Sequence, residues 1–393
     1  MVLMIALLAA LAPFRTGTAL AGAGWKQRIE NLAGDHPMSV AIGDDGQTWF
    51  RLRAWVRRAP ASNEKLLLSM ALFARLGTDR TIRTSLMTGA RRDGGTIEGN
   101  VWIVGRGDPE IADRQLGALA RQLVGDGVRR IRGGIRGSTA GFRRDWWARG
   151  WRDYFPRDYI PLPTALTYRG NRDSRGRHIT DPERRAARTL TNKLEGLGVR
   201  VVREPRAGVP TTSGRTIAEV RSAPLAAVVR RMNVTSRNFT AEVLGKYLGA
   251  RVTGTGSIAT GARVIRTFAA NQGVEVKTYD ASGLSYANRA SALGILTLLW
   301  AAQEEPWGAT LMGSLPHAGQ GTLRDRLEGV RLRAKTGTLE RISALSGWVW
   351  LERERRWAEF SIMSSGMSTT KAKTIENKIV RLVANNATDP TTS

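Results

Sequence analysis

The order of apolar and polar positions predicts paired strands near both ends of the chain. Met38–Ile42 and Thr48–Leu52 are short, apolar-rich runs joined by a Gly-Asp-Asp-Gly turn, the pattern of a β-hairpin. Leu345–Leu351 and Trp357–Met363 are two further runs of this kind, with the charged turn Glu352–Arg356 between them. We therefore expect two strand pairs that lie far apart in the sequence.

One predicted helix is apolar on nearly every side. The run Leu66–Phe73 follows Ser62 and Lys65, and Gly77 ends it. A helix that is apolar all round is usually buried at the centre of a protein, so we expect this one in the core. Further helices are predicted over Trp25–Leu32, Ala112–Leu123, Glu183–Leu197 and Ser368–Val383.

The middle of the chain differs in composition from both ends. From Arg80 to about Arg221 it is richer in Arg and Gly, with strand-like runs such as Val101–Val104. With 393 residues, the chain is long enough for two or three domains. We therefore predict that residues 24–80 and 225–388 form one domain, and that residues 81–224 form a second domain inserted into it.

The first residues indicate export. Met1–Ala12 is apolar throughout, and the small residues Ala19, Ala21 and Ala23 resemble a cleavage site. About a dozen apolar residues cannot cross a bilayer of roughly 30 Å as a helix. No Lys or Arg precedes the apolar run, so either translation starts upstream or the export signal is atypical; a buried N-terminal helix is the alternative. We predict a signal peptide over residues 1–23, no transmembrane anchor, and a location in the periplasm, the cell envelope or the extracellular space.

The charge balance is strongly basic. The chain has 60 Lys plus Arg against 34 Asp plus Glu, a formal net charge of +26. Nucleic acid is the first partner that such a charge suggests. However, 51 of these cations are arginines, spread from Arg15 to Arg381 with no run longer than two. Two interpretations stay open, namely an ordinary solvated surface and an attraction to some polyanion.

The residue types exclude several kinds of site. The chain has no Cys, which excludes disulfides, thiolate zinc sites and a cysteine nucleophile. Its three histidines, His36, His178 and His317, lie far apart and form no metal-binding motif. We expect neither a metal nor another cofactor.

Three short motifs contain the candidate catalytic residues. In chain order they are Ser62-x-x-Lys65, Ser236-x-Asn238 and Lys335-Thr336-Gly337. Together they match the motif set of β-lactamases and penicillin-binding proteins. A second Ser-x-x-Lys begins at Ser368, but it follows the last strands and opens a half-polar helix, so we interpret Ser368 as a helix cap.

The spacing of the first motif has a physical reason. Positions i and i+3 share one face of a helix, so Lys65 can reach the hydroxyl of Ser62. A serine hydroxyl is a poor nucleophile until a neighbour takes its proton. A lysine can take that proton only if burial or nearby cations lower its pKa, and we expect both the Leu-rich helix and Lys335 to do so. An arginine could not replace it, because its guanidinium does not lose a proton in proteins.

The sequence resembles the D-alanyl-D-alanine carboxypeptidase/endopeptidase family, the class C low-molecular-mass penicillin-binding proteins. Five ordered blocks carry the resemblance: Pro60-Ala61-Ser62-Asn63-x-Lys65-Leu66, Gly105-x-Gly107-Asp108-Pro109, Asn233-x-x-Ser236-x-Asn238-x-x-Ala241-Glu242, Asp280-x-Ser282-Gly283-Leu284-Ser285-x-x-Asn288-Arg289, and Gly321-Thr322-Leu323-x-x-Arg326 with Ala334-Lys335-Thr336-Gly337-Thr338-Leu339. The family implies an α/β (α+β) fold. Its transpeptidase-like catalytic domain is an antiparallel sheet flanked by helices, here with one inserted α/β domain.

The resemblance also implies a role for each matching residue. Ser62 would attack the carbonyl between two D-alanines and form an acyl-enzyme, and Lys65 would accept its proton. Ser236 would relay a proton to the leaving amine, while Asn238 would bind the substrate peptide and orient Lys65. The third motif, Lys335-Thr336-Gly337 with Thr338, would bind the substrate and its terminal carboxylate. The backbone N–H groups of Ser62 and Thr338 would form the oxyanion hole.

The resemblance and the predicted export together imply three kinds of partner: peptidoglycan stem peptides, β-lactams as inhibitors, and anionic cell-wall polymers. Export argues against nucleic acid as a partner.

Two positions depart from the family pattern, Arg237 and Ser138, since the family often has Asp at each. Two alternative functions are a β-lactamase and a non-catalytic protein that binds the cell wall. The long insert argues against the first, and the three intact motifs argue against the second. The sequence does not separate removal of a terminal D-Ala from cleavage of a cross-link.

Overall fold

A five-stranded antiparallel sheet joins the two ends of the chain. The computed structural model describes residues 17–210 and 214–387. The strands of this sheet lie in the order β10 (Leu332–Leu339), β11 (Ile342–Leu351), β12 (Arg356–Ser365), β1 (Met38–Asp44) and β2 (Gln47–Leu52). β1 pairs with β12 from Met38 opposite Ser364 to Gly43 opposite Glu359. Both predicted strand pairs are therefore confirmed, and they meet in one sheet.

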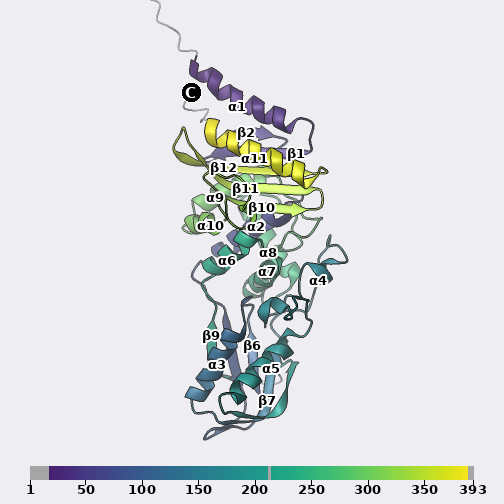
Figure 1. Cartoon of the computed structure of the whole chain (residues 1–393), viewed down its shortest axis with the longest axis vertical. Helices are drawn as coiled ribbons and strands as arrows, with labels where there is room; N and C mark the ends of the chain where they lie inside the picture. Colours follow the sequence, from purple (N-terminus) through teal and green to yellow (C-terminus); the bar gives the residue numbers. More distant parts are fainter. Residues whose placement is uncertain (1–16, 211–213, 388–393) are drawn as a thin grey trace, which may run out of the picture.

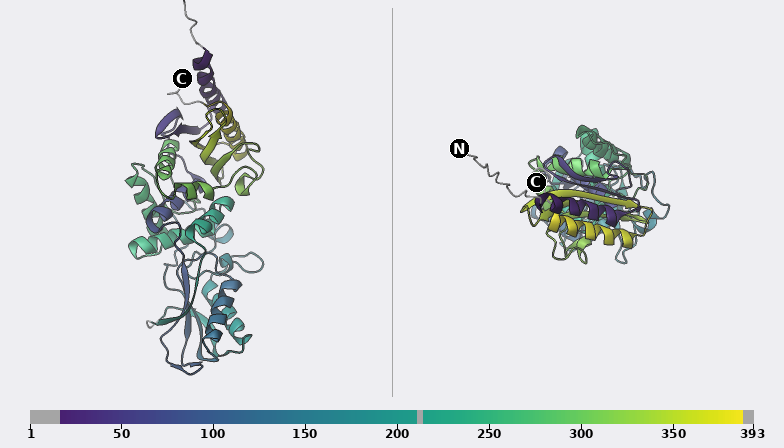
Figure 2. Two further views of the ribbon diagram at one scale, coloured as in Figure 1. Left: turned by 90° about the vertical axis from the view of Figure 1, so that its left-hand side faces the viewer. Right: turned by 90° about the horizontal axis from the view of Figure 1, so that it is seen from above.

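Helices cover both faces of this sheet. On one face α1 (Gly17–Ala33) and α11 (Thr369–Asn386) lie side by side (Figures 1 and 2). On the other face α9 (Ala292–Gln303) packs against β1 and β12. The helix predicted over Trp25–Leu32 is confirmed but begins earlier, at Gly17. Most of the predicted signal peptide, residues 1–16, lies outside the described residues. Across the described ranges, no helix has the length and apolarity needed to cross a membrane.

The helix α2 (Glu64–Leu76) lies at the centre of the molecule. Its first ten residues, through Phe73, are all buried, as the apolar sequence predicts. It contacts α6 (Leu225–Thr235), α7 (Asn238–Thr253) and α8 (Ile258–Asn271). Two shorter helical segments, α10 (Gly308–Ser314) and η3 (Gly321–Leu323), lie between α9 and β10 in the sequence. One detail differs from the expectation: Ser62 lies in a separate 3₁₀ turn, η1 (Ala61–Asn63), that precedes α2.

A second, separate sheet forms the far end of the elongated molecule (Figure 1). Its strands are β3 (Arg83–Thr88), β4 (Arg92–Asp93), β5 (Thr96–Ile97), β6 (Val101–Gly105), β7 (Arg130–Ser138), β8 (Arg200–Gly208) and β9 (Arg215–Arg221). The helices α3 (Asp113–Gly125) and α5 (Pro182–Glu195) complete this part, which we call the distal lobe. The short segments α4 (Phe155–Asp158) and η2 (Arg169–Asn171) lie between β7 and α5 in the sequence.

The distal lobe has its own apolar core. That cluster of buried side chains draws only on residues between Leu86 and Ala218. The α/β fold class, with helices flanking an antiparallel sheet, is confirmed. The separate core supports the predicted insertion, whereas the boundaries at residues 81 and 224 stay predictions.

The pair α7 and α8 is packed through glycines. A Cβ atom on Gly261 would lie 2.3 Å from the carbonyl oxygen of Gly245, and one on Gly249 would lie 2.5 Å from the hydroxyl of Thr260. Non-bonded atoms cannot approach so closely, so the two helix backbones are in direct contact. This matters for the site because α7 begins at Asn238, a residue of the second motif.

We expect Gly261→Ala to lower the free energy of unfolding by about 1–3 kcal/mol, the usual effect of overpacking a core. Gly313→Ala is the matched control, because Gly313 also lies in a helix but has no atom within 4 Å of its Cβ position. The control should be neutral or stabilising by about 0.4–1 kcal/mol. Urea unfolding of the three proteins measures both effects, and equal stabilities would contradict the direct contact.

Candidate active site

The turn that carries Ser62 is held in an unusual backbone conformation. Ala61 has φ 47°, a left-handed value that residues other than glycine rarely adopt. The side chain of Asn63 is buried and donates a 2.7 Å hydrogen bond to the hydroxyl of Ser346 on β11. Gly283 approaches from the other side, since a Cβ there would lie 1.9 Å from the carbonyl oxygen of Ala61. The strain at Ala61 persists because packing on both sides fixes it.

Lys65 is fully buried one turn after Ser62. Its ammonium nitrogen Nζ lies 3.0 Å from the hydroxyl of Ser62 and 2.8 Å from the side-chain oxygen of Asn238. It also donates a 2.5 Å hydrogen bond to the carbonyl oxygen of Ser282. Burial lowers the pKa of Lys65 to about 8, against the opposing effect of nearby carboxylates. A lysine with such a pKa can exchange a proton with Ser62 near neutral pH.

The second motif lies at the junction of two helices. Ser236 ends α6 in a left-handed conformation, with φ 56°, and Asn238 is the first residue of α7. This reversal of direction brings Ser236 and Asn238 to the same side as Lys65. Arg237 between them is exposed, so the departure from the family pattern lies outside the cluster.

The third motif lies on β10, at the edge of the five-stranded sheet. Lys335 is buried, and its Nζ donates hydrogen bonds to the hydroxyl of Ser236 at 3.0 Å and to the carbonyl of Thr336 at 2.8 Å. The hydroxyl of Thr336 donates to that of Thr322 at 2.8 Å. A Cβ on Gly337 would lie 2.6 Å from the carbonyl oxygen of Pro60, so only glycine allows β10 to pass this close to the turn.

The outer edge of β10 also places backbone donors near Ser62. Ala334 donates its N–H away from β11, to the carbonyl of Pro316 at 3.1 Å. Backbone N–H groups alternate in direction along a strand, so the N–H groups of Thr336 and Thr338 point to the same outer side. Thr338 is exposed, and Gly337 beside it is buried. A Cβ atom on Gly337 would lie 3.1 Å from the backbone nitrogen of Ser62, so the strand passes close to that nitrogen. This arrangement suits an oxyanion hole made by Ser62 and Thr338.

A buried carboxylate cluster surrounds the lysine. Glu64 accepts a 2.8 Å hydrogen bond from Thr278, and Glu242 accepts the backbone N–H groups of Ala281 and Ser282 at 2.9 and 2.7 Å. Burial, reinforced by Asp280, raises the pKa of Glu242 to about 8 and raises that of Glu64 well above its ordinary value. Burial therefore favours the protonated form of both side chains.

Asp280 organises the loop that supplies the carbonyl of Ser282. Its carboxylate is fully buried and accepts five hydrogen bonds, from Trp151, Asn288, the hydroxyl of Ser282, and the backbone N–H groups of Gly283 and Ser285. Ser282 is buried, and its hydroxyl donates to Asp280, so this serine helps to hold the turn together.

The structure brings seven of the eight predicted site residues into one connected cluster, with Thr338 at its exposed rim. Two expectations need comment. Ser368 accepts the backbone N–H of Lys371 and caps α11, as predicted. Burial lowers the pKa of Lys65, as expected from the apolar helix, and the repulsion between Lys65 and Lys335 lowers the pKa of Lys335 together with burial.

Sequence reasoning gave no role to the residues that support this cluster. They are Glu64, Thr278, Glu242, Thr322 and Ser346. The one available signal was an acidic residue inside an apolar helix, as at Glu64 and Glu242, because a buried carboxylate is rare without a specific partner.

Comparisons with known proteins agree on one family. The D-Ala-D-Ala carboxypeptidase 3 (S13) family matches residues 38–172 and 155–386. A protein of Actinomadura sp. named D-alanyl-D-alanine carboxypeptidase is 27% identical over 417 residues, covering 82% of this chain and 76% of its own. Carboxypeptidase DacB of Mycolicibacterium smegmatis is 27% identical over 403 residues, covering 94% and 84%. The crystal structure of penicillin-binding protein 4 from Haemophilus influenzae superposes with a TM-score of 0.81 at 18% identity, covering 91% of this chain and 99% of that one, which shows a shared fold.

We expect Asp280→Asn to destabilise the protein by at least about 2 kcal/mol, because an amide nitrogen cannot accept the hydrogen bonds that one carboxylate oxygen now accepts. Asp153→Asn is the matched control, since Asp153 is exposed and lies in the neighbouring segment. Urea unfolding measures the difference between the two variants. An unchanged stability of Asp280→Asn would contradict the organising role of this carboxylate.

Proposed function

Because the chain belongs to the D-Ala-D-Ala carboxypeptidase 3 (S13) family and is thus a serine-type peptidase, we propose that it hydrolyses D-Ala–D-Ala bonds of peptidoglycan stem peptides through an acyl-enzyme on Ser62. The observation that carries this proposal is the 3.0 Å contact between the buried Nζ of Lys65 and the hydroxyl of Ser62. A base within hydrogen-bond reach of a hydroxyl is the arrangement that activates a serine nucleophile.

In the first step Ser62 attacks the carbonyl carbon between the two D-alanines, and neutral Lys65 takes the hydroxyl proton. The hydrogen bond to Asn238 and the carbonyl of Ser282 hold the lysine in position for this transfer. The negative charge that develops on the carbonyl oxygen is stabilised by the N–H groups of Ser62 and Thr338.

The third motif recognises the terminal carboxylate. Burial and Lys65 lower the pKa of Lys335 well below its ordinary value in the free enzyme. A bound carboxylate would favour the charged form again, so Lys335, Thr336 and Thr338 together select a substrate that ends in a carboxylate.

The leaving amine needs a proton when the C–N bond breaks. Ser236 donates it and recovers the proton that Lys65 took from Ser62, while Lys335 orients the Ser236 hydroxyl through a 3.0 Å hydrogen bond. Lys65 is then neutral again for the second step. Water then attacks the ester of Ser62, releases the acyl group as a carboxylic acid and restores the hydroxyl. A β-lactam acylates Ser62 in the same way, because its amide replaces the scissile bond.

The location of the protein and the range of bonds that it cleaves are inferred from the same family membership. We infer that the protein is exported to the periplasm, cell envelope or exterior, and that it cleaves D-Ala cross-links as well as terminal D-Ala. The surplus of arginines gives it an attraction to anionic cell-wall polymers, weakened by salt because exposed charges are screened.

Penicillin should label the wild-type protein covalently and should fail to label Ser62→Ala, because the acceptor hydroxyl is gone. Ser368→Ala is the matched control, since it removes the serine of the other Ser-x-x-Lys and should label normally. Mass analysis of muropeptides after incubation should show loss of terminal D-Ala from monomers with the wild type alone. Dimers should also separate into monomers, because we infer cleavage of cross-links as well. Rapid turnover of penicillin would instead indicate a β-lactamase, and equal labelling of Ser62→Ala would refute the nucleophile.

The acylation rate should rise with pH and level off above about 8, the pKa of Lys65, because only the neutral amine accepts the proton. Below that pH the rate should fall about tenfold per pH unit, as the neutral fraction of a single base does. The acylation rate of Lys65→Arg should be lower by a factor of about 10²–10⁴, since a guanidinium stays protonated and cannot accept the proton of Ser62. Stopped-flow measurement of penicillin acylation between pH 5 and 9 tests this, and a flat profile would contradict the role of Lys65.

A further inference from the structure

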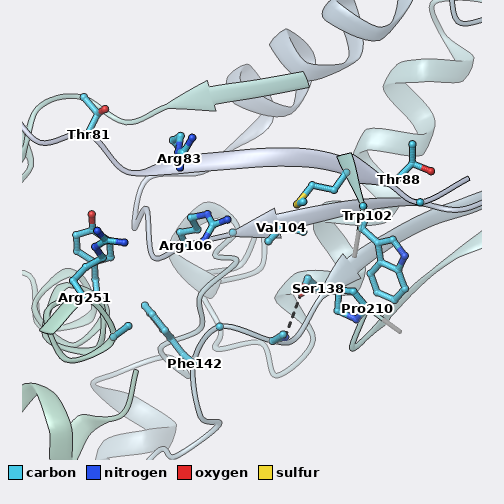
Figure 3. Close-up of a pocket in the computed structure, with 18 of the residues that line it drawn as sticks. Thr81, Arg83, Thr88, Trp102, Val104, Arg106, Ser138, Phe142, Pro210 and Arg251 are labelled. Atoms are coloured by element: carbon cyan, nitrogen blue, oxygen red, sulfur yellow. Dashed lines mark hydrogen bonds between the residues drawn. The ribbon is translucent and has the colours of Figure 1, made fainter. Parts of the chain in front are cut away.

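A cavity separate from the Ser62 site lies between the distal lobe and α7. Its volume is about 380 Å³, within the range of small-molecule sites. Strands β3, β6 and β7 supply its walls, and Tyr247, Ala250 and Arg251 of α7 close one side (Figure 3). Along α7, about 20 Å separates Arg251 from Asn238, at 1.5 Å per residue.

One end of the cavity is cationic. Arg83, Arg106 and Arg251 gather there with Thr81, as Figure 3 shows, and Arg80 also lines the cavity. None of the lining residues that the structure describes is acidic. Among the described residues, Arg80, Arg106 and Arg251 form no ion pair, although elsewhere many arginines of this chain do. Only Arg83 approaches a carboxylate, that of Glu219 at 3.8 Å.

One buried tyrosine lies within electrostatic reach of these arginines. Burial raises the pKa of Tyr247, whereas Arg251, Arg80, Arg106 and Arg83 all act to lower it. The four guanidinium groups therefore share one region of the cavity, whose lining includes all four residues. Like charges repel, so such a group is costly unless an anion binds among them.

The other end of the cavity is apolar and aromatic. The half-buried ring of Trp102 lies there beside Pro210, and Val104 continues the wall toward the arginines (Figure 3). Phe142 lies nearer to Arg251 in the same view. It is closely packed by two glycines, because a Cβ on Gly107 would lie 2.7 Å from its ring and one on Gly256 would lie 2.3 Å from it.

We propose that this cavity binds an anionic saccharide, with the sugar ring against Trp102 and its carboxylate or phosphate held by Arg106 and Arg251. An aromatic ring presents an apolar face to the C–H face of a sugar. Guanidinium groups bind carboxylate and phosphate through paired hydrogen bonds. This inference rests on the proposed attraction to anionic wall polymers and gives that attraction a location, independent of acylation at Ser62.

The test compares three sugars by isothermal titration calorimetry on the full chain at low salt. The probes are N-acetylmuramic acid for a carboxylate, glucose 6-phosphate for a phosphate, and N-acetylglucosamine as the neutral sugar. At least one anionic probe should bind at least about tenfold more tightly than the neutral one, because one charge-assisted hydrogen bond is worth about that factor. A stronger response to the carboxylate or to the phosphate identifies which wall polymer supplies the ligand.

Two double variants distinguish a site from general charge. Arg106→Ala with Arg251→Ala should weaken binding of the anion at least about tenfold, and Trp102→Ala should weaken it as well. Arg184→Ala with Arg188→Ala removes the same charge from exposed positions on α5 and should leave binding within about twofold. All variants should keep the wild-type rate of penicillin acylation. An unchanged rate would show that the variants are folded, and a failure of saccharide binding would then be distinguishable from a failure of the proposed Ser62 chemistry.

Three results would overturn the proposal. They are absence of binding by both anionic probes, equal binding of the neutral sugar, and an equal loss in the two double variants.

Discussion

The burial of Lys65 is the constraint on which the rest of the site depends. An ammonium group without partners would cost several kcal/mol in such a position. Three oxygens receive its protons, those of Ser62, Asn238 and Ser282, and each comes from a different part of the chain. The start of α2, the start of α7 and the loop after Asp280 must therefore all be in place before the lysine is tolerated.

The same burial explains why acidic residues gather around it. Glu64, Glu242 and Asp280 favour the charged form of the lysine, while burial opposes it, and the balance leaves the pKa of Lys65 about 8. Asp280 accepts five hydrogen bonds, whereas the pKa values of Glu64 and Glu242 are raised. Burial thus works against the negative charge of Glu64 and Glu242 as well as against the positive charge of the lysine.

Local sequence patterns predicted those features of the fold and the site that are determined by residues close together in the chain. The strand runs, the apolar helix α2 and the closeness of Ser62 to Lys65 follow from spacing of two to four residues, and the structure has each of them. The place of Ser236, Asn238 and Lys335 beside Lys65 came from a family resemblance, because no local rule links residues more than 170 positions apart. Support by Thr278 and Ser346 was missed for the same reason, because their partners Glu64 and Asn63 lie 214 and 283 positions away. Support by Thr322 was missed although its partner Thr336 is only 14 positions away, because no helix or hairpin spacing links the two. The 3₁₀ turn at Ser62 was missed because the left-handed Ala61 is fixed by Gly283 and by β11, not by its own neighbours.

The pairing of β1 with β12 sets the order of events when the protein folds. Met38 lies opposite Ser364, so the sheet closes only after nearly the whole chain is available. The strand β10, which brings Lys335 and Gly337 to Ser62, belongs to that sheet and is positioned at the same late stage. Contacts so distant in sequence form slowly. A chain that ended before β12 would lack the strand between β11 and β1, and it could not hold β10 and Lys335 beside Ser62 in this sheet.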